Sequence, residues 1–154
     1  MRILILTLLL LTISAVSCDE ALKTEFSTFL KTIIDTARAD FHNNDKVKDY
    51  FKTDFTYTER KHTEDIHSFL KLNVRDDYQL STDIMDVRKA GSEVQYRVGG
   101  GAHFTKKYVI NVKPLAGLGR IQLDVHRLEG GGDAGKLVLA SGRRVDCDTD
   151  FVSN

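Results

Sequence analysis

The pattern of hydrophobic and polar positions between residues 78 and 125 predicts four strands of an antiparallel sheet. Apolar and polar side chains alternate in 78–84, 94–98, 108–112 and 121–125, with β-branched and aromatic residues at every second position. This period is typical of a sheet with one face on a core and the other face in water. The residues predicted to point inward are Tyr78, Leu80, Thr82, Ile84, Val94, Tyr96, Val98, Tyr108, Ile110, Val112, Ile121, Leu123 and Val125.

Apolar residues that recur every three or four positions across 22–41 predict a long helix that packs on this sheet. A short helix should begin at Asp45, and a short strand should carry Phe55 and Tyr57. A further helix should begin at Thr63, which is a suitable N-cap. The sequence therefore predicts an α+β fold, in which an antiparallel sheet packs on an N-terminal long helix and two shorter helices.

Residues 1–17 have the features of a secretory signal peptide. Arg2 precedes an unbroken apolar run at 3–11, and 15–17 supply the residues at which a signal peptidase cuts. The apolar run is shorter than the about 20 residues that span a bilayer, so we expect no integral membrane segment. The protein should be secreted and extracellular, with residues 18–154 forming a single domain.

The two cysteines, Cys18 and Cys147, lie near opposite ends of the exported chain. An oxidising compartment would allow a disulfide between them, and such a long loop would stabilise the fold by about 4 to 5 kcal/mol in the chain-entropy model. Two alternatives stay open. Cleavage after Cys18 would leave Cys147 free, and a bacterial lipoprotein signal would acylate Cys18, although Ala15 stands where such signals prefer leucine.

The charge of the chain is balanced, with 22 lysine and arginine residues against 22 aspartate and glutamate residues. No basic stripe interrupts this balance, so neither a nucleic acid nor a charged membrane surface is an expected partner.

Residues 130–136 match the first seven places of a phosphate-binding loop, G-x-x-x-x-G-K. Leu137 stands where the Mg²⁺-binding serine or threonine should be, and 137–139 has the pattern of a strand instead of a helix. We therefore expect a hairpin connection at this position.

Two further patterns resemble metal sites, but neither is complete. His62 and His67 are five positions apart, which separates them by about 140° around a helix, so they do not converge on one ion. Residues 146–150 imitate the start of a calcium loop, but Phe151 replaces the required glycine. We expect no metal and no cofactor.

The order of the predicted elements resembles the nuclear transport factor 2-like superfamily. The segment 45–65 is most similar to it, with a short helix, an aromatic run and then a helix that begins near Thr63. The run reads Tyr50-Phe51-x-x-Asp54-Phe55-x-Tyr57. The ending at 139–147, Leu-Ala-Ser-Gly-Arg-Arg-Val-Asp-Cys, resembles that of small secreted animal members. The resemblance implies a curved antiparallel sheet of four to six strands, folded with its helices into a cone over residues 18–154.

Members of this superfamily include isomerases, dehydratases, epoxide hydrolases, polyketide cyclases and non-catalytic binding proteins, so the fold does not decide the function. Enzymatic members place an acid or base inside the cone. Here the predicted inner face is apolar, and Asp124 and His126 point the other way. We expect a non-catalytic secreted domain that binds a small apolar ligand or a protein partner. The alternative is a small enzyme of the isomerase, dehydratase or hydrolase type, which would use Asp54 or His67 with a tyrosine and would hold that group in a pocket.

We place three side chains with a polar end inside the cone, those of Tyr57, Tyr96 and Tyr108. Their hydroxyls are candidates to donate hydrogen bonds to a small apolar ligand. The competing interpretation is that they are core tyrosines whose hydroxyls reach solvent or backbone.

The polar face of the sheet often forms dimers in this superfamily. In this chain it would carry Gln95, Arg97, Asn111, Gln122, Asp124 and His126. The centres of stable interfaces are depleted in charge, so we predict a monomer or a weak homodimer through the open sheet face.

Overall fold

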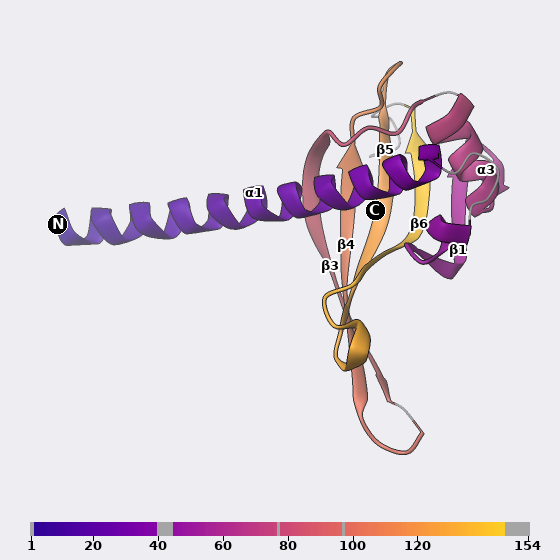
Figure 1. Cartoon of the computed structure of the whole chain (residues 1–154). Coiled ribbons are helices and arrows are strands. Elements are labelled where there is room, and N and C mark those ends of the chain that lie inside the picture. Colours follow the sequence, from indigo (N-terminus) through magenta and orange to yellow (C-terminus); the bar gives the residue numbers. More distant parts are fainter. Residues whose placement is uncertain (1, 40–44, 77, 97, 147–154) are drawn as a thin grey trace.

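The computed structural model describes residues 2–39, 45–76, 78–96 and 98–146, with side chains from Asp19 onward. A long N-terminal helix crosses one face of a curved, unclosed sheet, and two short helices lie beside one end of it (Figure 1). The elements in chain order are α1 (Arg2–Ala39), α2 (Asp45–Lys48), β1 (Phe51–Glu59), β2 (His62–Glu64), α3 (Ile66–Leu70), the π-helix η1 (Lys71–Asp76), β3 (Ile84–Tyr96), β4 (Ala102–Val112), β5 (Arg120–Glu129), the 3-10 helix η2 (Gly131–Asp133) and β6 (Leu137–Val145). The predicted α+β class is confirmed.

The six strands form one sheet in the order β2-β1-β6-β5-β4-β3. Strands β3 to β6 follow one another as an antiparallel meander, as predicted. The pairing of β1 with β6 is parallel, so the sheet is mixed. Parallel neighbours need a long connection between them. The chain between β1 and β6, which contains α3 and the whole meander, provides it.

The alternation in β4 and β5 is confirmed. Tyr108, Ile110 and Val112 are buried on one face of β4. On β5 the buried residues of that face are Ile121, Leu123 and Val125, whereas Asp124 and His126 lie on the opposite face. The inner face packs on α1, because the ring of Phe26 contacts Tyr108 edge to face at 5.2 Å. The core therefore lies between the meander and the long helix.

The prediction of three strands between residues 78 and 112 is wrong, because the structure has two. Residues 78–83 form no strand. Their backbone groups pair elsewhere: the amide of Leu80 donates to the carbonyl of Asn73, and the amide of Leu115 donates to the carbonyl of Gln79, both at 2.9 Å. Ile84 and Val94 belong to one long strand, β3, in which Gly91 lies at a shift in register instead of in a turn.

The N-cap of helix α3 lies two residues later than predicted, at Asp65 instead of Thr63. Thr63 is not its N-cap, because residues 62–64 form β2 and Thr63 pairs with Thr58. Asp65 caps the helix, and its carboxylate accepts a hydrogen bond from the amide of Ser68 at 2.8 Å. This hydrogen bond lowers the pKa of Asp65.

Helix α1 begins at Arg2 and ends at Ala39, whereas the apolar periodicity predicted 22–41. It therefore includes most of the predicted signal peptide, whose removal stays a prediction. Among the described residues, no helix combines the length and the apolar character that crossing a membrane requires.

The glycine-rich segment between β5 and β6 is a hairpin connection, as expected. The amide of Leu128 donates to the carbonyl of Lys136 at 2.9 Å, which closes the loop around η2. Leu137 then begins β6, so no helix follows this loop.

Candidate functional site

An aromatic cluster beside α3 fills one end of the inner face. The ring of Phe69 lies 4.9 Å from that of Tyr57 and 5.4 Å from that of Phe55. Phe51 completes the cluster at 6.0 Å. All four side chains are buried. Packed rings therefore occupy the part of the cone where Tyr57 was expected to meet a ligand.

Tyr57 is fully buried, and its hydroxyl group faces Asn73. The hydroxyl lies 3.5 Å from Oδ1 of Asn73, whose Nδ2 donates to the carbonyl of Phe69 at 3.2 Å. Burial, followed by the charge of Glu59, raises the pKa of Tyr57. The hydroxyl is thus engaged within the core, as the core-tyrosine interpretation expected.

The raised pKa of Tyr57 predicts a loss of stability at alkaline pH. The fold favours the neutral hydroxyl, so its contribution is complete below the usual pKa of 10.0 and is lost as the pH rises above that value. We expect this residue to make the free energy of unfolding fall above about pH 10, with a slope approaching about 1.4 kcal/mol per pH unit. Urea unfolding of wild type and Tyr57→Phe between about pH 9 and 11 would measure the difference, with Tyr96→Phe as the matched control. Equal slopes in wild type and Tyr57→Phe would contradict the assignment.

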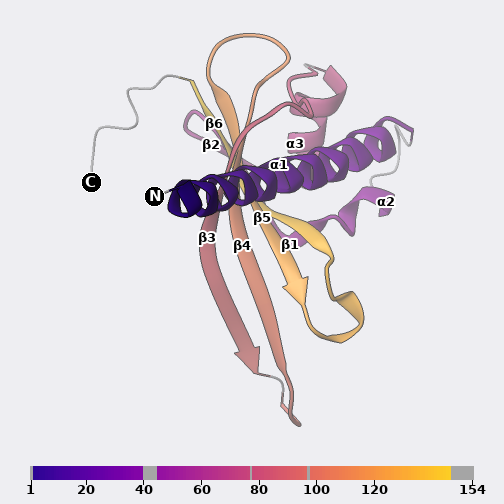
Figure 2. The ribbon, with the colours of Figure 1, turned by 90° about the vertical axis from the view of Figure 1, so that its left-hand side faces the viewer.

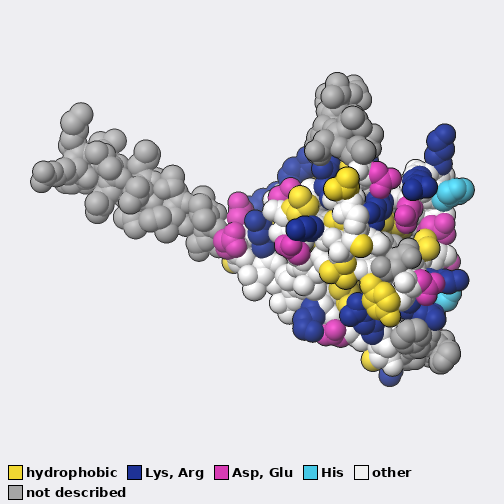
Figure 3. All heavy atoms as spheres, turned by 90° about the horizontal axis from the view of Figure 1, so that it is seen from above, with side chains coloured by type: hydrophobic (Ala, Val, Ile, Leu, Met, Phe, Trp, Pro, Cys, Tyr) yellow, Lys and Arg dark blue, Asp and Glu magenta, His cyan; other side chains and the backbone are white. Residues whose placement is uncertain are grey.

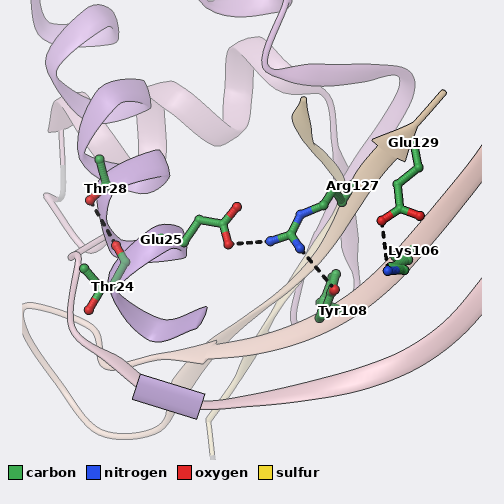
Figure 4. Close-up of polar contacts among 7 residues, drawn as sticks. All are labelled: Thr24, Glu25, Thr28, Lys106, Tyr108, Arg127 and Glu129. Carbon is green, nitrogen blue, oxygen red and sulfur yellow. Dashed lines mark hydrogen bonds and ion pairs between the residues drawn. The ribbon is translucent and has the colours of Figure 1, made fainter. Parts of the chain in front are cut away.

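Tyr108 belongs to a polar cluster that joins α1 to the sheet (Figure 4). Its hydroxyl accepts a hydrogen bond from Nη1 of Arg127 at 3.5 Å, and the guanidinium also lies 5.4 Å from its ring centre. The other end of the guanidinium forms an ion pair with Glu25 on α1. Only 18% of the Arg127 side chain is exposed, so this pair is partly protected from solvent. The cluster therefore ties the turn of α1 around Glu25 to β4 and β5.

An open pocket of about 250 Å³ lies next to Tyr108. It is lined by Lys89, Gly91, Ser92, Lys106, Lys107 and Tyr108. Sites for drug-sized ligands usually measure about 300 to 1,000 Å³ and have mostly apolar walls. The volume and the three lysines therefore give little support to Tyr108 as a residue that binds a small apolar ligand.

The expectation that Tyr96 points into the cone is wrong. Its side chain is 84% exposed, and Val98 is fully exposed. The reason is visible in Figures 1 and 2, where the β3–β4 hairpin projects well beyond the other strands and beyond α1. The alternation continues along the hairpin, but no helix covers its inner side there.

The two residues on which the enzymatic alternative depends are exposed to solvent. The Asp54 side chain is 75% exposed and lies 3.6 Å from Nζ of Lys52. His67 is on the exposed side of α3. That alternative expected one of them to be held in a pocket, and neither side chain is buried.

The outer face of the sheet carries a chain of hydrogen bonds across four strands. Asn111 donates to Asp86 at 2.7 Å, and Gln122 donates to Asn111 at 3.3 Å. Arg143 then donates to Gln122 at 2.7 Å. These side chains satisfy one another, which favours a solvated face over a dry interface.

Asp124 and His126 continue this polar face along β5. Ser141 donates a hydrogen bond to Asp124. Burial of the imidazole, followed by the charge of Lys52, lowers the pKa of His126. Gln95 lies further out on the projecting hairpin, and Arg97 lies outside the described residues.

The projecting part of the hairpin, which we call the β3–β4 arm (residues 88–96 and 102–106), exposes apolar side chains on one face. The register places Val94 opposite Phe104 and Tyr96 opposite Ala102. Residues that face one another across an antiparallel pair lie on the same side of the sheet. Val94 is 42% exposed and Phe104 is 48% exposed. An apolar row therefore continues the inner face into solvent.

Strand β3 is also an edge of the sheet, because β4 is its only neighbour among the described strands. It is 13 residues long, and Met85 at its start is 50% exposed. A long edge strand with exposed apolar side chains is a template for pairing with another chain. The arm and this edge together are the candidate functional site.

A second group of exposed apolar side chains lies at the opposite end of the molecule. Leu115 and Leu118 protrude from the β4–β5 loop, and the Arg38 guanidinium lies 5.1 Å from the ring centre of Tyr78. In the view of that end in Figure 3, hydrophobic side chains lie among charged groups of both signs. They lack the strand register that aligns Val94 with Phe104.

The sequence interpretation missed Met85 and Phe104 as surface residues. A signal for the hairpin was present, because three glycines at 99–101 separate Tyr96 from Ala102 and favour a turn. No local pattern indicates the ion pair between Glu25 and Arg127, whose partners are 102 positions apart.

The predicted disulfide lies outside the described residues. The side chain of Cys18 and the whole of Cys147 belong to the parts of the chain that are not described, so their pairing stays a prediction. Among the described residues, no group of three or more histidine, cysteine, aspartate or glutamate side chains is placed to hold a metal ion.

Comparison of the chain with protein-family models, curated proteins and solved structures gave no match.

Proposed function

We propose that this chain is a secreted, non-catalytic domain of the nuclear transport factor 2-like type that recognises a protein partner by pairing a strand of that partner with β3. The observation that carries the proposal is the exposed edge of β3, a 13-residue strand with apolar side chains open to solvent. Strand addition to a free sheet edge is a recurrent mode of peptide recognition.

The backbone of β3 supplies the affinity in this proposal. Each residue of an edge strand carries an amide and a carbonyl group, and only those that point toward the neighbouring strand are paired. The only neighbour of β3 within the described sheet is β4. A partner strand would satisfy the groups that point away from β4.

The side chains of β3 supply the specificity. Val87, Val94 and Tyr96 lie on the inner side, opposite Ile110, Phe104 and Ala102 of β4. Arg88 and Glu93 lie on the outer side, opposite Val109 and Thr105. The matching partner is therefore an extended segment with apolar residues at alternate positions, an acidic residue opposite Arg88 and a basic residue opposite Glu93.

This mode explains the surface better than a small ligand inside the cone. Tyr57 is engaged by Asn73, and Tyr108 is held by Arg127 and Phe26. The polar outer face, for which a monomer or at most a weak homodimer was predicted, satisfies its own hydrogen bonds. The arm, in contrast, presents apolar side chains such as Val94 and Phe104 to solvent in strand register.

A synthetic peptide tests the proposal. The probe is an 11-residue peptide in which valine and tyrosine alternate with charged residues, with glutamate set opposite Arg88 and arginine opposite Glu93. We expect fluorescence anisotropy to detect binding and hydrogen exchange to show protection of the β3 amides. The same peptide with N-methylated amides should not bind, because it cannot donate the ladder hydrogen bonds.

Variants of the arm provide the controls. Tyr96→Ser should weaken peptide binding about tenfold or more, since burying an aromatic ring against a partner contributes more than about 1.4 kcal/mol. Leu118→Ser removes an 87% exposed side chain from the β4–β5 loop and should leave binding unchanged. Absence of binding, or protection on the outer sheet face instead of β3, would refute strand addition.

A further inference from the structure

We infer that the strand that pairs with β3 is β3 of a second copy of this chain, antiparallel to the first about a two-fold axis between Ala90 and Gly91. This inference rests on the proposed function and names the partner. The evidence is the order of charges and apolar residues along β3, together with its shift in register.

The charges of β3 are self-complementary in this arrangement. Arg88 of each copy comes opposite Glu93 of the other, so the two-fold axis creates two ion pairs. Both side chains are exposed and lie on the outer side of the strand. Glu93 already pairs with Lys107 at 2.9 Å and accepts a hydrogen bond from Gln95 at 3.2 Å, and its carboxylate retains lone pairs for a further donor.

The apolar residues match in the same arrangement. Val87 comes opposite Val94 of the second copy, and both lie on the inner side. Met85 lies at a second shift in register, between Ile84 and Asp86, and comes nearest to Tyr96 of the second copy; these side chains are 50% and 84% exposed in the single chain. The Val87–Val94 pair occurs twice, so pairing adds two apolar cross-strand contacts on the inner side.

The shift in register makes this match possible. Between the shift at 84–86 and the shift at 89–92 the inward residues are odd-numbered, Val87 and Lys89; after the second shift they are even-numbered, Ser92, Val94 and Tyr96. Residues that face one another across a two-fold axis perpendicular to the sheet must lie on the same side. A regular strand would put Val87 and Val94 on opposite sides. The extra residue between Lys89 and Ser92, at which Gly91 has a φ of 103°, brings them to one side.

Other registers fit less well. Sliding the two strands by two residues in one direction places Asp86 opposite Glu93, and like charges in this position are unfavourable. Sliding them by two residues in the other direction places Arg88 opposite Gln95, so both ion pairs are lost. The charge pattern therefore selects one register, in which the two sheets become continuous through β3.

Charge reversal tests the pairing. Sedimentation equilibrium of the purified full chain should show a concentration-dependent dimer. Arg88→Glu and Glu93→Arg should each weaken self-association at least about tenfold, because each creates two like-charge contacts. An equimolar mixture of the two variants should associate as well as wild type, since every contact then joins opposite charges. Circular dichroism of each variant verifies the fold.

The control variant is Arg143→Glu, which reverses an exposed arginine of the outer face on β6. It should leave the dimer intact. Loss of the dimer in this variant but not in Arg88→Glu would assign the interface to the open sheet face and overturn the inference. A chain that stays monomeric would also overturn it; if that monomer still binds the synthetic peptide, strand addition stands and only self-pairing is lost.

Discussion

Replacing Phe69 with alanine should lower the free energy of unfolding by about 3 to 5 kcal/mol, as truncation of a buried phenylalanine usually does. Phe69 is fully buried, and its ring contacts Phe51, Phe55 and Tyr57 at 4.9 to 6.0 Å. It is a side chain through which α3 packs on β1, so neighbouring rings cannot close the cavity without moving that helix. Urea unfolding followed by circular dichroism measures the loss.

Phe104→Ala is the matched control, because it deletes the same atoms from a side chain that is 48% exposed on the arm. Surface substitutions usually change stability by less than about 0.5 kcal/mol. A monomeric sample should therefore unfold at nearly the wild-type urea concentration. Similar losses in the two variants would mean that the aromatic cluster beside α3 is not the part of the core that limits stability.

Strands β4 and β5 could be predicted from the sequence because each is buried on one face along the part that crosses the core. Ile110 and Leu123 are fully buried, whereas their neighbours Asn111 and Gln122 are only partly buried. A one-residue slip would exchange these sets, so the hydrophobic effect ties the pattern strongly to the register. The same reasoning placed Asp124 and His126 on the outer face correctly.

Residues 78–83 could not be assigned in this way, because tertiary hydrogen bonds decide their conformation. Leu80 is buried, as an inward-facing strand residue would be, and Tyr78 lies two positions before it, as the alternation of a strand requires. However, Tyr78 adopts a φ of 51°, and the Ser81 hydroxyl donates to the carbonyl of Lys113 at 2.5 Å. The acceptor, Lys113, belongs to the β4–β5 loop, and no local sequence pattern indicates this contact.

The sequence did not predict the exposed arm, for a different reason. Tyr96 and Tyr108 have the same alternation, and both lie on the inner side of the sheet. Tyr96 is 84% exposed and Tyr108 only 5%, because the hairpin that carries Tyr96 extends past α1. Alternation indicates which side a residue faces, but it does not indicate whether another element covers that side. Whether a residue of β3 is covered depends on how far the strand extends beyond α1, and this follows only from the assembled fold (Figures 1 and 2).

Replacing Gly142 with alanine should destabilise the fold by about 1 to 3 kcal/mol, the usual effect of overpacking a core. Gly142 lies on β6 between Leu123 and Tyr57, its partners on the two neighbouring strands. An added Cβ would lie 2.7 Å from Cδ2 of Leu123 and 3.0 Å from Cδ2 of Tyr57. Both side chains are fully buried, so neither can move aside without disturbing the core.

We expect Gly142→Ala to destabilise the protein only because there is no space for the added methyl group. Alanine in place of glycine reduces the entropy of the unfolded chain and by itself stabilises a protein by about 0.4 to 1 kcal/mol. Gly132→Ala isolates that contribution, since nothing lies within 4 Å of the position of its added Cβ. Urea unfolding should show Gly132→Ala at least as stable as wild type and Gly142→Ala clearly less stable. If Gly142→Ala matched Gly132→Ala, the contact of β6 with Leu123 and Tyr57 would be looser than the structure places it, and the buried position of Tyr57 would lose its main support.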